Sequence, residues 1–339
     1  MKIEIIAFTP RGCGLGQTLE QQLSSKGHTA AFSFGTGEHK VSLPPWTKNA
    51  FASADVLIFV GAAGIAVRAC APHIVSKVSD PAVLVLDEAG EYCIPLLSGH
   101  IGGANAFAKQ VAELIGAKAV ITTATDVSGL WAVDSWAVSQ SLMIVNPEKI
   151  KCVSARLLAE QQVLVCCRVP VSGELPRGVC ITNDLAACHV LISPMAEDAP
   201  HALQLVPLVA VLGLGCRKET AKAQIEEAFQ GALAQTGLHP AAFGLACSID
   251  LKANEQGILE FCADRKIPYK TFPMHELAAV AGEFSVSGFV KSVTGVDNVC
   301  ERSAVLGSHG GKLLLKKQAE NGVTTAVAIK EITVHFNTY

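Results

Sequence analysis

The feature that most constrains the fold is a repeated order of elements: a short apolar run, a turn, and a stretch with helical spacing. Apolar runs of strand length occur at residues 3–8, 56–60 and 82–86, and amphipathic stretches follow them. A continuous apolar run is typical of a strand buried on both faces of a parallel sheet. The sequence therefore predicts an α/β fold with parallel or mixed sheets covered by helices on both faces.

Three regions can be distinguished along the 339 residues. Residues 1–136 form an N-terminal α/β domain, and residues 137–200 form a small, less regular middle region that ends in a proline-flanked linker. Residues 201–339 form a C-terminal α/β domain, which opens with another apolar run and a glycine-rich turn. The sequence thus predicts a multi-domain protein, as expected from its length.

Composition excludes several classes of protein. Half of the residues are hydrophobic, only 17% are charged, and the formal net charge is −3. Such a chain has enough apolar residues for a real core and no basic tract for nucleic acid. No apolar run approaches the roughly 20 residues that span a membrane. Twelve cysteines without a Cys-x-x-Cys pair predict buried free thiols in a reducing, cytoplasmic setting.

The most open candidate site is the segment LSGHIGGAN at residues 97–105. His100 lies between glycines directly before a helical pattern, so backbone N–H groups at the helix start can face a negatively charged oxygen. An imidazole with an ordinary pKa of about 6.5 can activate water near neutral pH. This pattern favours a site for acyl or carboxylate chemistry, although a lone histidine is often only structural.

An acidic turn lies just before that segment, with Asp87, Glu88 and Glu91 after an apolar run. Carboxylates this close can raise one another's pKa, which suits a general acid or base. Because ligands bind at the carboxyl ends of parallel strands, we expect this turn beside the His100 segment. The alternative is a solvated turn without a chemical role.

Three glycine-rich stretches remain. GCGLG at residues 12–16 lacks the spacing of a dinucleotide site and predicts a tight turn from strand to helix. GAAGIAVR at residues 61–68 predicts one wall of a cleft with the His100 segment. GLGCRK at residues 213–218 favours an anionic ligand at a helix start, or else a plain surface turn. No metal-ligand spacing occurs in the sequence.

Several motifs occurring in order resemble the CbiG family of cobalamin-biosynthesis proteins, the cobalt-precorrin-5A hydrolases. The first domain contributes GAAGIAVR at 61–68, LSGHIGGAN at 97–105 and TTATD at 122–126, and the third contributes GLGCRK at 213–218, SIDLKANE at 248–255 and VCE at 299–301. The resemblance covers nearly the whole chain, and the middle region matches least.

The resemblance implies an enzyme of anaerobic vitamin B12 synthesis. Water opens the ring A δ-lactone of cobalt-precorrin-5A, and a C–C bond is then cleaved to release acetaldehyde and cobalt-precorrin-5B. No cofactor is expected, because cobalt arrives within the substrate. The alternative is a tetrapyrrole-binding carrier without catalysis. A homodimer and contacts with neighbouring enzymes of the pathway are both compatible with the sequence.

The reaction that the resemblance implies suggests roles for particular residues. The expected catalytic groups are His100, Glu88 and Asp87, with backbone N–H groups near Gly99 as donors to the oxyanion. The cations among the expected substrate-binding residues suit the substrate's carboxylates. The expected binding residues are Gly61, Gly64, Arg68, Lys77, Ser98, Gly99, Gly102, Gly103, Asn105, Thr123, Asp126, Gly213, Gly215, Arg217, Lys218 and Lys252.

Overall fold

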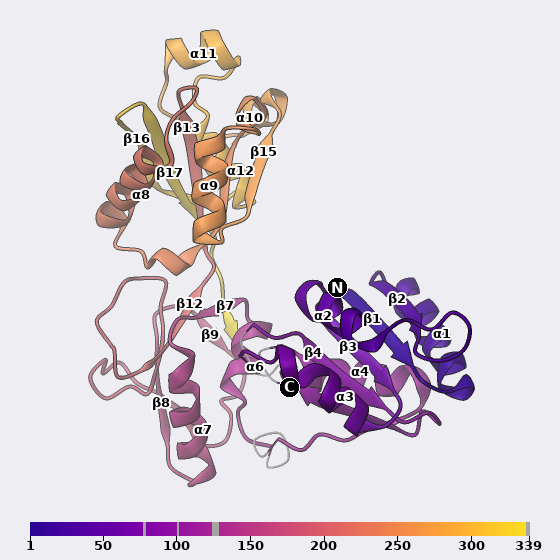
Figure 1. Ribbon diagram of the computed structural model, residues 1–339. Helices are drawn as coiled ribbons and strands as arrows, with labels where there is room; N and C mark the ends of the chain where they lie inside the picture. The colour runs from indigo at the N-terminus through magenta and orange to yellow at the C-terminus, as the bar shows by residue number, and fades with distance from the viewer. Residues whose placement is uncertain (77–78, 100–101, 124–128, 337–339) are drawn as a thin grey trace. The chain divides into compact units, whose positions relative to one another are not determined.

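The computed structural model describes residues 1–76, 79–99, 102–123 and 129–336. The chain divides into two compact units, Met1–Ser135 and Trp136–Tyr339 (Figure 1). Each unit has its own sheets and its own buried core. The three-region division expected from the sequence stays a prediction.

Unit 1 contains one mixed six-stranded sheet in the order β2-β1-β3-β4-β5-β6. The strands are β1 (Lys2–Ala7), β2 (Thr29–Phe34), β3 (Val56–Val60), β4 (Ala82–Leu86), β5 (Tyr92–Leu97) and β6 (Lys118–Ala119). The first four are parallel to one another, β5 is antiparallel to β4, and β6 is parallel to β5. The sheet therefore changes direction once, between β4 and β5.

Helices cover both faces of this sheet. On one face lie α1 (Pro10–Ser25) and α4 (Ala104–Ile115), and on the other lie α2 (Leu43–Ser53) and α3 (Ala63–Cys70), which leads into the short η1 (Ala71–His73). Strand β3 is fully buried, so Ile58 packs under the first pair of helices and Phe59 under the second. A continuous apolar strand is what this two-sided cover requires.

The glycines at residues 12–16 lie inside α1 and not in a turn, so the prediction of a tight turn there is wrong. Thr9 caps the helix by accepting a hydrogen bond from the Gly12 N–H, and Pro10 occupies its first turn. A side chain at Gly16 would overlap the Phe32 ring. Glycine at position 16 therefore lets α1 approach β2 closely.

Unit 2 contains two five-stranded sheets. The first has the order β10-β8-β11-β12-β7, formed by β7 (Leu142–Ile144), β8 (Val163–Cys167), β10 (Val179–Ile181), β11 (Val190–Ile192) and β12 (Leu203–Pro207). The chain also forms α6 (Val133–Ser139), η2 (Pro147–Lys149) and α7 (Ile150–Leu158). A separate parallel pair joins β9 (Val171–Ser172) to β18 (Val334–His335).

The second sheet has the order β15-β14-β13-β17-β16. Its strands are β13 (Ala210–Cys216), β14 (Phe243–Ile249), β15 (Tyr269–Phe272), β16 (Lys312–Glu320) and β17 (Val323–Ile329). One face packs against α8 (Lys222–Thr236) and α9 (Gln256–Arg265), and the other against α10 (Met274–Ala279) and α12 (Cys300–Gly307). The remaining elements are η3 (Pro240–Ala242), η4 (Asp250–Lys252) and α11 (Gly288–Thr294).

These sheets and helices confirm the predicted α/β class with mixed sheets, and helices cover both faces of the unit 1 sheet and of the second sheet of unit 2. The expectation of free thiols is also confirmed, because all twelve cysteines are unbridged and eight of them are buried. Among the described residues, no helix has both the length and the apolar character needed to cross a bilayer.

Candidate functional site

The reversal between β4 and β5 divides the predicted site residues between two edges of the unit 1 sheet. Leu86 pairs with Cys93, and Val83 pairs with Leu97, so the two strands form an antiparallel hairpin. The acidic turn lies at the carboxyl end of β4, whereas the chain leaving Leu97 lies at its amino end. The prediction that the acidic turn, residues 61–68 and the segment after β5 lie side by side is therefore wrong. It requires β5 to run parallel to β4, whereas the two strands form an antiparallel hairpin.

The acidic turn is built by Asp87 itself. Its two carboxylate oxygens accept hydrogen bonds from the backbone N–H groups of Ala89, at 3.0 Å, and Tyr92, at 2.6 Å. Gly90 adopts a φ of +71°, which closes the turn. Asp87 thus shapes the hairpin, while the neighbouring Glu88 is exposed to solvent.

At the opposite edge, hydrogen bonds tie Ser98 and Gly99 to Asp80 and to the start of α4. Ser98 has a φ of +56°, and its hydroxyl donates a hydrogen bond to the Asp80 carbonyl oxygen at 2.9 Å. The N–H groups of Ala104 and Asn105 donate to the carbonyl oxygens of Ser98 and Gly99, at 3.1 and 2.9 Å. Two amides at the start of α4 are therefore used within the segment and are not available to a ligand.

Glycine is required at several positions of this segment. A side chain at Gly102 would overlap Ser98, and a Cβ at Gly99 would lie 2.8 Å from the Asn105 Oδ1. Gly103 has a φ of +77° immediately before α4. The glycines therefore allow the chain to fold tightly, in addition to any contact with a ligand.

Two polar side chains tie this edge together. Asn105, only 6% exposed, donates from its amide nitrogen to the Thr123 hydroxyl at 3.0 Å. The Asp80 carboxylate accepts hydrogen bonds from the N–H groups of Val75 and Ser76, both at 3.0 Å. The amino end of β4, the carboxyl end of β5, the start of α4 and the chain after β6 consequently meet here.

An open pocket of about 480 Å³ adjoins this edge. Its lining includes Asp80 together with Lys48, Phe51, Ala52, Pro72, His73, Val75, Ser79 and Pro81. Three of the predicted site residues, Lys77, His100 and Asp126, lie outside the described residues. The described residues Ser76, Gly99 and Thr123 lie at this edge, and these polar contacts together with the pocket form the candidate site.

The predicted residues Gly61 and Gly64 lie at the other edge, after β3, together with the acidic turn. Gly61 has a φ of +155° and lies beside the Phe8 ring, and Gly64 lies in the first turn of α3. Arg68 is exposed, and its Nη1 donates to the Gly64 carbonyl oxygen at 3.1 Å. The sequence alone does not show that β5 runs antiparallel to β4, so it could not show that these residues and the segment after β5 lie at opposite edges.

In unit 2, the GLGCRK motif is part of a strand and its following loop. A side chain at Gly213 would overlap the Cys300 carbonyl group, so this glycine permits close packing of α12 on β13. Gly215 faces Thr324 on the neighbouring strand. Arg217 and Lys218 are exposed after β13, before α8 begins at Lys222. Packing accounts for both glycines, and their predicted role in binding stays a prediction.

The Lys252 ammonium is already paired, at 2.7 Å from the Glu255 carboxylate, and both side chains are largely buried. Burial alone raises the pKa of Glu255, but the hydrogen bond from Lys252 and backbone N–H groups at Glu219 and Thr220 lower it below its usual value. Burial also raises the pKa of the nearby Cys216 thiol. This arrangement leaves Lys252 less available to a substrate carboxylate than Arg217 or Lys218.

Within the described ranges, no group of three or more His, Cys, Asp and Glu side chains has the arrangement of a metal site. The expectation that no cofactor is needed stays a prediction.

Comparisons with known proteins identify relatives over most of the chain. The sequence model of the Cobalamin synthesis G N-terminal family matches residues 45–126, and that of the Cobalamin synthesis G C-terminus matches residues 210–328. A cobalt-precorrin-5A hydrolase of Salmonella typhimurium is 36% identical over 83% of this chain and 84% of its own length. A cobalt-precorrin-5A hydrolase of Priestia megaterium is 29% identical over 96% of this chain and 94% of its own length.

Solved structures include a homologue of cobalamin biosynthesis protein G from Sulfolobus solfataricus. It aligns with 97% of both chains, at 22% identity and a TM-score of 0.42.

Proposed function

Because the chain belongs to the Cobalamin synthesis G (CbiG) family, we propose that it is a cobalt-precorrin-5A hydrolase. The observation that carries the proposal is the 36% identity to a hydrolase of that name over 83% of the chain, which spans parts of both units. The substrate is a carboxylate-rich tetrapyrrole that carries its own cobalt. A cytoplasmic location, a homodimer and contacts with neighbouring pathway enzymes stay predictions.

The reaction consists of two steps. Water first adds to the lactone carbonyl, and collapse of the tetrahedral intermediate gives a carboxylate and a free hydroxyl. Loss of the hydroxyl proton then allows the adjacent C–C bond to break, so that acetaldehyde leaves. The conjugated macrocycle takes the bonding electron pair and is protonated afterwards.

We assign the proton transfers to the edge that carries residues 98–105. His100 is the proposed base, and N–H groups of Gly99, Gly102 and Gly103 are the proposed oxyanion donors. Glu88 does not fit the same site, since a five-residue strand such as β4 separates the two edges by about 16 Å. Asp87 is occupied by its turn hydrogen bonds.

Exposed cations are available for the substrate's acetate and propionate groups. Arg68 in unit 1 and Arg217 and Lys218 in unit 2 are exposed, and Lys77 is a further candidate. A guanidinium can bind a carboxylate through two parallel hydrogen bonds. We propose each of them, within its own unit, as a candidate partner for a carboxylate in preference to Lys252, which is already paired with Glu255.

The test is incubation of the pure protein with cobalt-precorrin-5A under anaerobic conditions. Acetaldehyde is trapped and measured, and the corrinoid is analysed for the matching change in mass. Stoichiometric acetaldehyde supports the hydrolase. Binding of the substrate without acetaldehyde would instead indicate a tetrapyrrole carrier and would contradict the proposal.

A further inference from the structure

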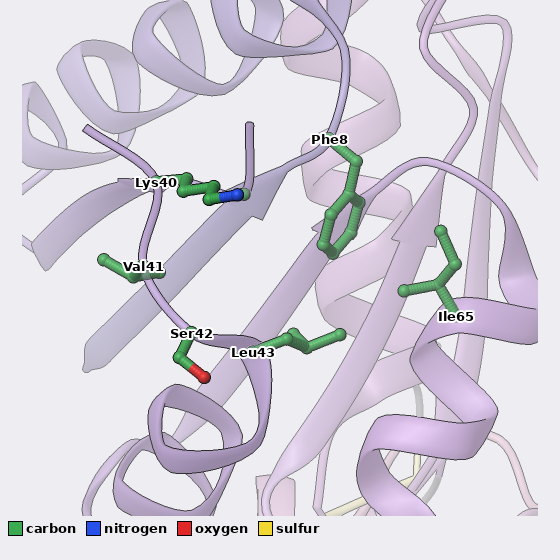
Figure 2. Close-up of a pocket in the computed structure, with 7 residues that line it drawn as sticks. Phe8, Lys40, Val41, Ser42, Leu43 and Ile65 are labelled. Atoms are coloured by element: carbon green, nitrogen blue, oxygen red, sulfur yellow. The ribbon is translucent and has the colours of Figure 1, made fainter. Parts of the chain in front are cut away.

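A second pocket of unit 1 lies at the edge opposite the candidate site. It has a volume of about 550 Å³ and is lined by Phe8, Gly35, Lys40, Val41, Ser42, Leu43 and Ile65 (Figure 2). These residues follow the carboxyl ends of β1 and β2 or begin α2 and α3. Ligands of open α/β sheets bind at this edge, yet the mechanism above uses none of these side chains.

The floor of this pocket is an aromatic ring held between two glycines. A Cβ at Gly35 would lie 2.5 Å from the Phe8 ring, and one at Gly61 would lie 3.0 Å from it. Any larger residue at either position would therefore displace the ring. Figure 2 shows Phe8, Leu43 and Ile65 directed toward one common space, which gives the pocket a flat, apolar surface.

One charged group accompanies this surface. Lys40 is exposed, and among the described residues it forms no ion pair. Figure 2 shows its side chain extending from the wall opposite Ile65 in the direction of Phe8. Among the residues that the structure describes, none with a carboxylate lines this pocket to oppose an anion. The Ser42 hydroxyl adds a polar group, because it makes no capping hydrogen bond to α2.

We infer that this pocket binds a planar conjugated ring that carries a carboxylate. The ring stacks on Phe8 between Leu43 and Ile65, and the carboxylate pairs with Lys40. Resting on the proposed function, the ligand is an acid-bearing tetrapyrrole of the substrate's class, bound at a site separate from residues 98–105, because the two edges of the sheet lie about 16 Å apart. The pocket's volume is in the range of small-molecule sites and accommodates only part of a macrocycle.

The inference is tested with uroporphyrin I, a stable planar tetrapyrrole with an acetate and a propionate on every ring. Binding is followed by fluorescence anisotropy of the porphyrin, with no turnover required. Lys40→Gln should weaken binding about tenfold, because one charge-assisted hydrogen bond is lost, and Lys40→Arg should restore it. Ile65→Trp should fill the pocket and weaken binding by a similar factor.

Matched controls carry the same changes away from the pocket. Lys26→Gln removes an exposed charge at the end of α1, and Val67→Trp adds the same indole at an exposed position of α3. Both should bind uroporphyrin like the wild type. Thermal unfolding of each variant verifies that it folds.

Two outcomes would overturn the inference: no uroporphyrin binding by the wild type, or wild-type affinity in both Lys40→Gln and Ile65→Trp. These outcomes are independent of the hydrolase assay. A wild type that binds uroporphyrin through Lys40 but releases no acetaldehyde from cobalt-precorrin-5A contradicts the proposed function alone. If the wild type releases acetaldehyde but Lys40→Gln and Ile65→Trp bind uroporphyrin with wild-type affinity, only the inference about the pocket is contradicted.

Discussion

The side-chain amide of Asn105 donates a hydrogen bond to the Thr123 hydroxyl across 3.0 Å, and thereby joins the start of α4 to the chain that follows β6. Both residues belong to motifs by which the sequence resembles its family. Because Asn105 is only 6% exposed, water cannot readily replace its partner. The pair therefore stabilises the edge to which His100 is assigned.

Replacing Asn105 should destabilise unit 1 measurably. Asn105→Leu keeps the approximate volume but leaves the half-buried Thr123 hydroxyl without its donor, and loss of one such hydrogen bond costs about 0.5–1.5 kcal/mol. Urea unfolding should show this loss as a lower midpoint. Asn49→Leu, at an exposed position of α2, should change the free energy of unfolding by less than about 0.5 kcal/mol. Equal midpoints for the two variants would show that the Asn105 contact is unimportant.

Gly102→Ala should strongly lower the rate of acetaldehyde release while the protein remains folded. The added methyl group would overlap Ser98, so residues 98–105 must open and move the proposed oxyanion donors. A displacement of about 1 Å can lower turnover by about 10²-fold. Gly14→Ala is the matched control, since a Cβ there meets no atom within 4 Å and the helix should gain up to about 1 kcal/mol. Unchanged acetaldehyde release by Gly102→Ala would contradict the assigned role of this segment.

The Lys252–Glu255 pair predicts a pH-dependent contribution to the stability of unit 2. Burial works against the Glu255 charge, but Lys252 and two backbone N–H groups outweigh it and lower the pKa below the ordinary value of 4.5. The unfolded chain consequently takes up the proton first. This contribution is present above pH 4.5 and is lost as the pH falls through the lower pKa of the folded state.

Glu255→Gln should therefore be less stable than the wild type at pH 7, and the difference should shrink below pH 4.5. Chemical unfolding of both proteins across this range measures the difference directly. Glu260→Gln, an exposed position on the same α9 helix, removes the same charge without a buried partner and should follow the wild type. A difference that grows toward low pH would have the wrong sign for this account.

Thiol labelling should distinguish one cysteine from the rest. Cys152 is the exposed cysteine, whereas burial raises the pKa of Cys70 to about 11 and that of Cys93 to about 12. Because burial both shields a thiol and disfavours the reactive thiolate, a thiol reagent should modify the exposed Cys152 before the buried thiols. Cys152→Ser should abolish the fast phase. Fast labelling of Cys70 or Cys93 in that variant would contradict their burial.

Sequence patterns predicted the strands of unit 1 well where burial is complete. The runs at residues 56–60 and 82–86 match β3 and β4 in full, because two covered faces require continuous apolar residues. Helix α4 ends at Gly116, which takes the left-handed conformation at φ +72° that favours glycine at a helix end.

The sequence analysis did not predict strand β5. Without this strand, the segment after Leu97 was expected at the same edge as the acidic turn, whereas it lies at the opposite edge. Its residues are mostly half-buried, and it contains Pro95, which argues against a central strand. In the structure β6 pairs only with Tyr92 and Cys93, so the chain at Pro95 is unpaired on that side. The signal that could have revealed the hairpin is Asp87 with Gly90 three residues later, a turn pattern between two apolar runs.

The glycines of GLGCRK illustrate a second limit of the sequence. Glycine before a positive loop resembles an anion-binding motif, but Gly213 is accounted for by α12, a helix that begins at Cys300, far along the chain. No local pattern can show which distant backbone approaches a glycine. Such close contacts become visible only once the strands are paired.

The most direct test of the central claim is the amount of acetaldehyde that purified protein releases from cobalt-precorrin-5A without oxygen. The wild type should release one equivalent as the corrinoid loses the corresponding mass. His100→Ala should still bind the substrate but turn over at least ~10²-fold more slowly, as expected when an acid–base group is lost. No acetaldehyde from the wild type would contradict the hydrolase, and full turnover by His100→Ala would remove this histidine from the mechanism.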